Sequence, residues 1–220
     1  MEIGHMDSVT EYLQQTVPKR KKWMIELESY ASEHQIPVME PVSLHFLTQL
    51  VRMKKPKTIL EIGTAIGYSA LRMNDAYSLT KVTTIEKNET MYQRALENIK
   101  RQDKESEIEL IFGDALEEIN LLALNNRTFD IIFIDAAKGQ YKRFFELVQP
   151  LLKKDGIIIC DNILFRGYVA DESKVNNKRL QKLAKKIRDF NEWLTSNEHY
   201  HTSIIPIGDG VSISIKKNNI

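Results

Sequence analysis

The stretch Thr-Ile-Leu-Glu-Ile-Gly-Thr-Ala-Ile-Gly-Tyr-Ser-Ala, residues 58–70, decides the fold. It begins with a short apolar run, Thr58–Ile62, passes through two glycines and leads into a segment with helical spacing. A short apolar run followed by a glycine turn and a helix is typical of the first unit of a parallel α/β sheet. The glycines allow the backbone to pass close to a bound ligand before the helix begins.

The same alternation of apolar runs and amphipathic helices continues toward the C-terminus. The predicted strands are Thr58–Ile62, Val82–Glu86, Ile108–Phe112, Phe129–Ile134 and Gly156–Asp161, and the predicted helices span about 66–74, 89–102, 115–124, 141–152 and 177–196. Two further β-rich runs, Thr202–Ile207 and Val211–Lys216, flank a Gly-Asp-Gly turn and predict a closing antiparallel hairpin. The pattern therefore predicts a doubly wound, Rossmann-like α/β fold.

The first 55 residues are predicted to form helices that precede the sheet. Apolar residues recur at helical spacing in two segments, around Leu27 and around Leu47, and Pro37 and Pro41 separate them. A chain of 220 residues without repeats or long linkers favours one domain over residues 1–220. Within it, residues 1–55 are a helical N-terminal extension and residues 56–220 are the Rossmann-like core.

Composition excludes several classes of protein. Hydrophobic residues make up 42% and charged residues 28%, as in ordinary globular proteins. No apolar run approaches the roughly 20 residues that cross a bilayer, and no secretory signal is recognisable at the N-terminus, so we expect a cytoplasmic protein without a membrane partner. The single cysteine, Cys160, lies in an apolar run, which indicates a buried and inert thiol.

Acidic residues and glycines follow the first three predicted strands, where open α/β sheets bind ligands. Glu61 and Gly63 belong to the first strand end, Glu86 closes the second, and Gly113 and Asp114 follow the third. Each also has a structural explanation as a tight turn, a solvated strand end or a helix cap. The Glu-x-Gly-x-x-x-Gly spacing disfavours a dinucleotide, whose pyrophosphate an acid would repel, and suits the cationic sulfonium and ammonium of S-adenosylmethionine.

Two more strand ends carry oxygen ligands and no histidine or cysteine ligand. Asp135 follows the fourth predicted strand, and Asp161 and Asn162 follow the fifth. Such a set predicts a site for Mg²⁺ or another divalent cation rather than zinc, although Asp161 and Asn162 are also common turn residues. Lys138 either helps to deprotonate a metal-bound hydroxyl or balances charge, unless it is an ordinary surface lysine.

The runs at residues 60–69, 135–138 and 161–162 resemble the metal-dependent class I O-methyltransferases that include catechol and caffeoyl-CoA methyltransferases. The run 134–141 and the segments 161–167 and 206–210 most resemble the bacterial tRNA 5-hydroxyuridine methyltransferases. The resemblance implies a seven-stranded sheet of order 3-2-1-4-5-7-6, a homodimer, and catalytic roles for Asp135, Lys138 and Asp161. It implies metal binding by Asp135, Asp161 and Asn162, and cofactor contacts by Met39, Glu61, Gly63, Ser69, Glu86, Gly113, Asp114 and Asp135.

Basic clusters support an RNA substrate. Lys19–Lys22 is one cluster. Lys178–Arg188 carries six positive residues on a predicted amphipathic helix, whose predicted buried stripe is Leu180, Leu183, Ala184, Ile187 and Leu194. They are suited to RNA phosphates near a tRNA anticodon, although a charge run is more often a solvated face. The 5-hydroxyl of the base lies beside a carbonyl, so both oxygens can chelate one metal. A small catechol or phenol is the alternative substrate, and a non-catalytic nucleotide-binding module is the second alternative.

Overall fold

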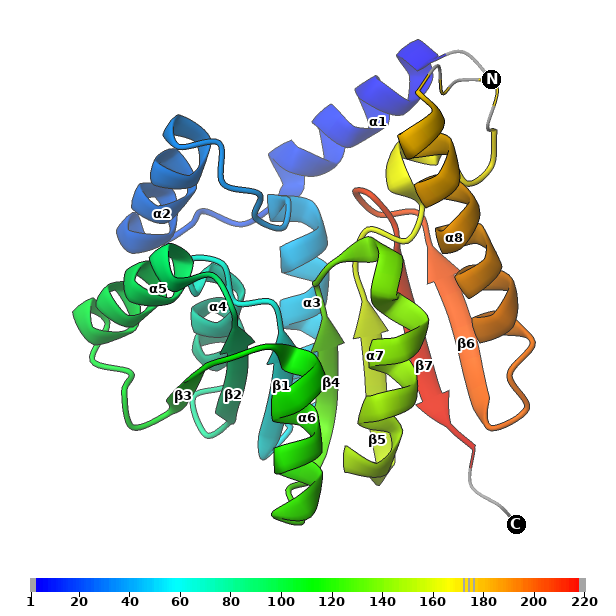
Figure 1. Ribbon diagram of the computed structural model, residues 1–220. Coiled ribbons are helices and arrows are strands. Elements are labelled where there is room, and N and C mark those ends of the chain that lie inside the picture. The colour runs from blue at the N-terminus through cyan, green and yellow to red at the C-terminus, as the bar shows by residue number, and fades with distance from the viewer. Residues whose placement is uncertain (1–2, 172, 174, 176, 218–220) are drawn as a thin grey trace.

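Seven strands form one mixed sheet in the order β3-β2-β1-β4-β5-β7-β6, as predicted (Figure 1). The structure is a computed structural model that describes residues 3–217 except 172, 174 and 176. The strands are β1 (Thr58–Ile62), β2 (Lys81–Glu86), β3 (Ile108–Phe112), β4 (Phe129–Ile134), β5 (Leu152–Cys160), β6 (Tyr200–Ile205) and β7 (Val211–Lys216). The first five pair in parallel, and β7 pairs antiparallel with both β5 and β6. The order reverses between β1 and β4, where open α/β sheets bind ligands.

Helices cover both faces of the sheet (Figure 1). They are α1 (Ile3–Thr16), α2 (Lys22–Glu33), α3 (Pro41–Lys54), α4 (Tyr68–Ala76), α5 (Glu89–Arg101), α6 (Ala115–Leu124), α7 (Tyr141–Val148) and α8 (Lys178–Thr195), with short 3₁₀ turns η1 (Lys138–Gln140), η2 (Gln149–Leu151) and η3 (Phe165–Gly167). Buried side chains of α2 to α5 pack on one face, and those of α6 to α8 pack on the other. Helices α2 and α3 of the N-terminal extension therefore share a core with the sheet.

Strand residues alternate between these two cores. Ile131 and Phe133 of β4 belong to the core under α2 to α5, whereas Ile132 and Ile134 belong to the core under α6 to α8. All four are fully buried. Burial of one such side chain stabilises the fold by about 1.5 to 3 kcal/mol. A parallel strand covered on both faces therefore becomes a continuous apolar run, which is the pattern that revealed it in the sequence.

Three sequence predictions in the C-terminal half of the fold were wrong in detail. The helix predicted for 141–152 ends at Val148, because Pro150 sits at the start of the η2 turn, and β5 begins at Leu152 rather than Gly156. Leu180 was assigned to the buried stripe of α8 but is 36% exposed. Cys160 is buried, as predicted. No helix among the described residues is long and apolar enough to cross a membrane.

Candidate active site

The carboxyl ends of the five parallel strands open into one pocket of about 880 Å³. Strand register brings these ends level, since Ile62 of β1 pairs with both Ile85 of β2 and Ile134 of β4, and Ile134 pairs with Cys160 of β5. Residues that follow these strands therefore meet at one edge of the sheet. Of the predicted site residues, the pocket is lined by Met39, Gly63, Ser69, Glu86, Gly113, Asp114, Asp135, Lys138, Asp161 and Asn162.

The turn after β1 requires a glycine at its first position. Gly63 has a φ of +97°, and a Cβ there would lie 2.1 Å from the backbone oxygen of Asp135. Gly67 has a φ of +80° and is the residue from which α4 begins. The turn is therefore packed directly against the end of β4. The predicted cofactor-binding glycines thus lie beside Asp135, which is predicted to bind metal.

Glu86 and Asp114 lie on the β2 and β3 side of the pocket, and both already have structural partners. The Oε2 atom of Glu86 accepts the Ala65 N–H at 2.9 Å, and its Oε1 atom accepts the Asn88 N–H at 2.8 Å. Asp114 caps α6 by accepting the Leu116 N–H at 2.9 Å. Each carboxylate oxygen has a second lone pair, so these bonds fix the side chains and leave acceptors free for hydroxyl or amino groups.

Glu61 lies beneath the pocket and is the one predicted cofactor contact that does not line it. Its Oε2 atom accepts the Thr84 hydroxyl at 2.5 Å, and Thr84 in turn contacts the hydroxyl of the pocket residue Thr64 at 2.6 Å. Its Oε1 atom has no hydrogen-bond partner among the described residues. Burial raises the pKa of Glu61 to about 8, and the hydroxyls of Ser69 and Thr84 offset this only in part.

The segment before α3 brings two neighbouring side chains to the pocket. Met39 is buried and Glu40 is exposed, and both line the cavity. The family resemblance implied a cofactor contact for Met39, and Glu40 lines the same cavity beside it. Ser69, in the first turn of α4, is also buried at the pocket wall.

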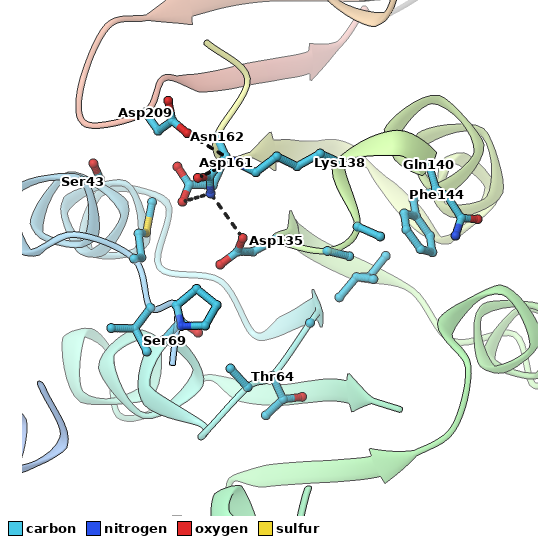
Figure 2. Close-up of a pocket in the computed structure, with 18 of the residues that line it drawn as sticks. Ser43, Thr64, Ser69, Asp135, Lys138, Gln140, Phe144, Asp161, Asn162 and Asp209 are labelled. Carbon is cyan, nitrogen blue, oxygen red and sulfur yellow. Dashed lines mark hydrogen bonds and ion pairs between the residues drawn. The ribbon is translucent and has the colours of Figure 1, made fainter. Parts of the chain in front are cut away.

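The predicted metal ligands converge at the ends of β4 and β5 (Figure 2). The Nδ2 atom of Asn162 donates to Asp161 Oδ2 at 2.8 Å and lies 3.4 Å from Asp135 Oδ1. Asp161 is 3% exposed, whereas Asp135 is half-buried. Tyr141 donates its hydroxyl to the backbone oxygen of Asp161 at 2.8 Å, which anchors the turn from below. The three side chains, which the sequence placed at the ends of two strands, therefore meet at one point.

Electrostatics disfavours two ionised carboxylates at this point. Burial raises the pKa of Asp161, and repulsion from Asp135 raises it further. Burial also raises the pKa of Asp135, while the positive charge of Lys138 opposes that rise. Lys138 is the nearby cation, and its Nζ atom donates to Asn162 Oδ1 at 2.9 Å and to Asp209 Oδ2 at 3.1 Å. A further positive charge would favour the ionised form of both aspartates.

Asp135, Asp161 and Asn162 fit a hard divalent cation by their chemistry. Two carboxylates and an amide oxygen are ligands of Mg²⁺, which completes its shell with water or substrate oxygens. The Asn162 amide now turns its nitrogen toward the carboxylates, so binding through its oxygen requires the amide to rotate. Among the described residues no group of three His, Cys, Asp or Glu side chains could hold a metal ion, so the candidate set depends on the asparagine.

The profile of the O-methyltransferase family matches residues 14–217. The chain belongs to this O-methyltransferase family. A caffeoyl-CoA O-methyltransferase from Populus kitakamiensis is 31% identical over 219 residues, covering 88% of this chain and 91% of that protein. A candidate caffeoyl-CoA O-methyltransferase from Staphylococcus aureus is 40% identical with a TM-score of 0.88, covering 94% and 99% of the two chains. An O-methyltransferase from Bacillus cereus, solved with S-adenosylhomocysteine, is 26% identical with a TM-score of 0.81, covering 96% and 97%.

These comparisons confirm the predicted fold and family of this O-methyltransferase. Residues that the sequence predictions did not include complete the side of its pocket around the candidate metal ligands, which is called the acceptor side below. The loop at residues 162–167, called the acceptor loop below, contributes Phe165 and Arg166, and the β6–β7 turn contributes Asp209. Phe165 lies under the Lys138 ammonium, 5.0 Å from Nζ to ring centroid. The sequence analysis treated residues 206–210, which include Asp209, only as a turn and as one segment of the family resemblance.

The two basic clusters of the O-methyltransferase differ in their surroundings. In the first cluster, Arg20 pairs with Glu28, Lys21 with Asp75 and Lys22 with Glu26, so these charges are shared with acids of the same chain. The second cluster begins at the pocket, because Leu180 in the first turn of α8 lines the cavity. Four lysines of α8 are exposed: Lys178, Lys182, Lys185 and Lys186. Of the two clusters, the one on α8 adjoins the pocket, although its Lys185 pairs with Asp189. Lys87, Lys138 and Arg166 bring further positive charge to the pocket lining itself.

Proposed function

We propose that the protein transfers a methyl group from S-adenosylmethionine to a hydroxyl oxygen with the help of a divalent cation, and that its acceptor is 5-hydroxyuridine at the tRNA wobble position. One observation carries this proposal. A single pocket joins a glycine turn with two flanking carboxylates, Glu86 and Asp114, to the half-buried Asp135, the buried Asp161 and Asn162. The S-adenosylhomocysteine in the related Bacillus cereus enzyme supports the choice of cofactor.

Each end of the pocket has its own task. Glu86 and Asp114 present acceptors to the hydroxyl and amino groups of a nucleoside, and Gly63 lets the chain approach it closely. Asp135, Asp161 and Asn162 would hold the cation. When bound, the cation would lower the pKa of the acceptor hydroxyl and orient a second oxygen beside it. Most of the rate enhancement would come from positioning and charge stabilisation.

Lys138 is placed to handle charge at the acceptor hydroxyl. Its ammonium is held between Asn162 and Asp209 and lies on the ring of Phe165, so it faces the acceptor side of the pocket rather than bulk water. As an ammonium, Lys138 would stabilise the developing oxyanion; to receive the hydroxyl proton, it would first have to release one of its own protons. Both roles agree with the sequence hypothesis for this residue.

Electrostatics at the pocket mouth supports an RNA acceptor. Arg166 lines the pocket, and α8 presents exposed lysines from its first turn onward. A nucleotide in the pocket would bring its flanking phosphates to this rim. The homodimer implied by the family resemblance is part of the proposal, and light scattering at several concentrations tests it.

A small catechol or phenol is the second candidate acceptor. The Populus relative is named for caffeoyl-CoA, whose phenolic ring carries two adjacent oxygens, and the candidate metal site would serve such a pair equally well. The two acceptors differ in charge. RNA binding should weaken steeply as salt rises, whereas the affinity of a neutral phenol should hardly change.

The experiment that tests the proposal is methyl transfer from labelled S-adenosylmethionine in Mg²⁺. Two tRNA preparations, one with and one without 5-hydroxyuridine, and a simple catechol are offered in parallel. We expect label in the hydroxylated tRNA alone or in strong preference. Label in the catechol alone would favour the small-molecule enzyme. Cofactor binding without transfer to any acceptor would favour the non-catalytic module.

A further inference from the structure

We propose that Asp209 is a positioning residue for the acceptor side of the pocket, where it holds both the Lys138 ammonium and the backbone of the acceptor loop. The proposal rests on the function proposed above and adds a residue to it. Asp209 belongs to the β6–β7 turn, distant in sequence from every predicted site residue. Figure 2 shows it beside Asn162 and Lys138.

The two carboxylate oxygens of Asp209 serve two different partners. Oδ2 accepts from Lys138 Nζ at 3.1 Å, and Oδ1 accepts the backbone N–H of Arg166. The backbone oxygen of Asp209 accepts the Leu164 N–H at 2.8 Å, and the next residue, Gly210, accepts the Ile163 N–H at 3.1 Å. The β6–β7 turn thus binds three backbone N–H groups of the acceptor loop, those of Ile163, Leu164 and Arg166, and also the Lys138 ammonium.

The acceptor loop needs such support because its backbone is strained. Asn162, Phe165 and Arg166 have φ values of +60°, +47° and +56°, in the left-handed region that residues with a Cβ rarely occupy. Conformations of this kind persist only where the surroundings fix them, and they cluster at functional sites. Asn162 and Phe165 carry side chains that define the acceptor side of the pocket, so a relaxed loop would displace both.

The β6–β7 turn is itself held in place. A Cβ at Gly208 would lie 2.1 Å from Ser43 Oγ, and a Cβ at Gly210 would lie 2.3 Å from Leu164 Cγ. The turn therefore fits closely between α3 and the acceptor loop. Among the described residues, none of the hydrogen bonds or ion pairs of Asp209 reaches Gly63, Glu86 or Asp114 on the cofactor side.

Asp209→Asn tests this proposal, and Asp130→Asn is its matched control. Asp130 is also 21% exposed, and it likewise accepts a lysine, Lys153 at 2.9 Å, and backbone N–H groups, those of Lys57 and Thr58. It lies at the opposite end of the sheet. Both substitutions keep side-chain size and an acceptor oxygen while they remove the charge that the lysine faces.

For Asp209→Asn we expect kcat/KM for the methyl acceptor to fall about tenfold or more, since small displacements of positioning groups cost that much. The Kd for S-adenosylhomocysteine should stay within about twofold, and Asp130→Asn should change neither quantity by more than about twofold. Either an unchanged kcat/KM in Asp209→Asn or an equal loss in Asp130→Asn would overturn the proposal. So would a parallel loss of S-adenosylhomocysteine affinity in Asp209→Asn.

Hydrogen exchange separates this proposal from the proposed function. The amides of Ile163 to Gly167 should exchange about tenfold faster or more in Asp209→Asn, and at the wild-type rate in Asp130→Asn. If the wild-type protein methylates neither tRNA nor a catechol, the proposed function fails. The exchange rates still test whether Asp209 holds the acceptor loop. If the Arg166 amide exchanges at the wild-type rate in Asp209→Asn, the proposal that Asp209 holds the acceptor loop is overturned, whatever the activity.

Discussion

Replacement of Glu61 by glutamine should stabilise the ligand-free protein, and increasingly so as the pH rises. Glu61 is fully buried, and burial raises its pKa from 4.5 to about 8. A carboxyl whose pKa is raised in the folded state contributes stability that is fully present below pH 4.5. That contribution declines as the pH approaches 8, because the unfolded chain releases a proton that the folded chain retains. Glutamine cannot ionise and lacks this dependence.

The magnitude follows from the size of the pKa shift. Each pKa unit corresponds to 1.36 kcal/mol, so between pH 5 and pH 7 wild-type stability should fall by about 2 to 3 kcal/mol relative to Glu61→Gln. For a chain of this length, about 1 kcal/mol changes Tm by roughly 2 to 4 °C. The Tm of Glu61→Gln minus that of the wild type should therefore rise by roughly 5 to 10 °C over this pH interval.

Thermal unfolding followed by circular dichroism at several pH values measures this difference. Glu109→Gln is a suitable control, because a hydrogen bond from Arg127 lowers the pKa of Glu109 and its removal should not stabilise the protein at neutral pH. If the Tm difference for Glu61→Gln is the same at pH 5 and pH 7, Glu61 is ionised in the folded protein. The reasoning from its burial and its unpartnered Oε1 atom would then be refuted.

The metal set, the basic helix and the glycine turn each lead to a further expectation. Asp161→Ala should lower turnover about a hundredfold or more, whereas its affinity for S-adenosylhomocysteine, measured by calorimetry, should change little. Full activity of this variant, or of the wild type in a chelator, would rule out the metal role. Charge reversal at Lys182 and Lys186 should reduce the salt dependence of tRNA affinity by roughly one to two units of log K per log salt, with no effect on a phenol. Gly63→Ala should lower Tm and cofactor affinity far more than Gly167→Ala, since both glycines have positive φ but only the Gly63 Cβ would meet another atom within 4 Å.

The parallel strands could be predicted because their burial on both faces produces apolar runs with clear ends. β1, β3 and β4 have the predicted bounds. β5 was predicted too short, because Lys153, Lys154 and Asp155 interrupt its apolar run while the backbone remains extended. Leu180 was misplaced because helical spacing shows which residues share a face of a helix, but not whether the sheet or a cavity lies opposite that face.

The acid pair could be predicted because parallel strands end at a common edge. Sequence position after β4 and after β5 was enough to place Asp135 beside Asp161 and Asn162. Asp209 could not be found in this way. It comes from an antiparallel hairpin, where the register that brings its carboxylate to Lys138 depends on the long-range pairing of β7 with β5. Nor could spacing show that Glu61 points beneath the pocket rather than into it.

The three acids near the pocket floor indicate which ligands the fold accepts. Glu61, Asp135 and Asp161 all have raised pKa values, and burial is the first cause in each. Such groups are costly to ionise alone, but a cation beside them offsets the cost and binds more tightly for the same reason. A cationic cofactor above Glu61 and a divalent ion between the aspartates would therefore stabilise the folded state as they bind. A pyrophosphate brings no positive charge to offset the cost of ionising these acids, which argues in physical terms against a dinucleotide at this glycine turn.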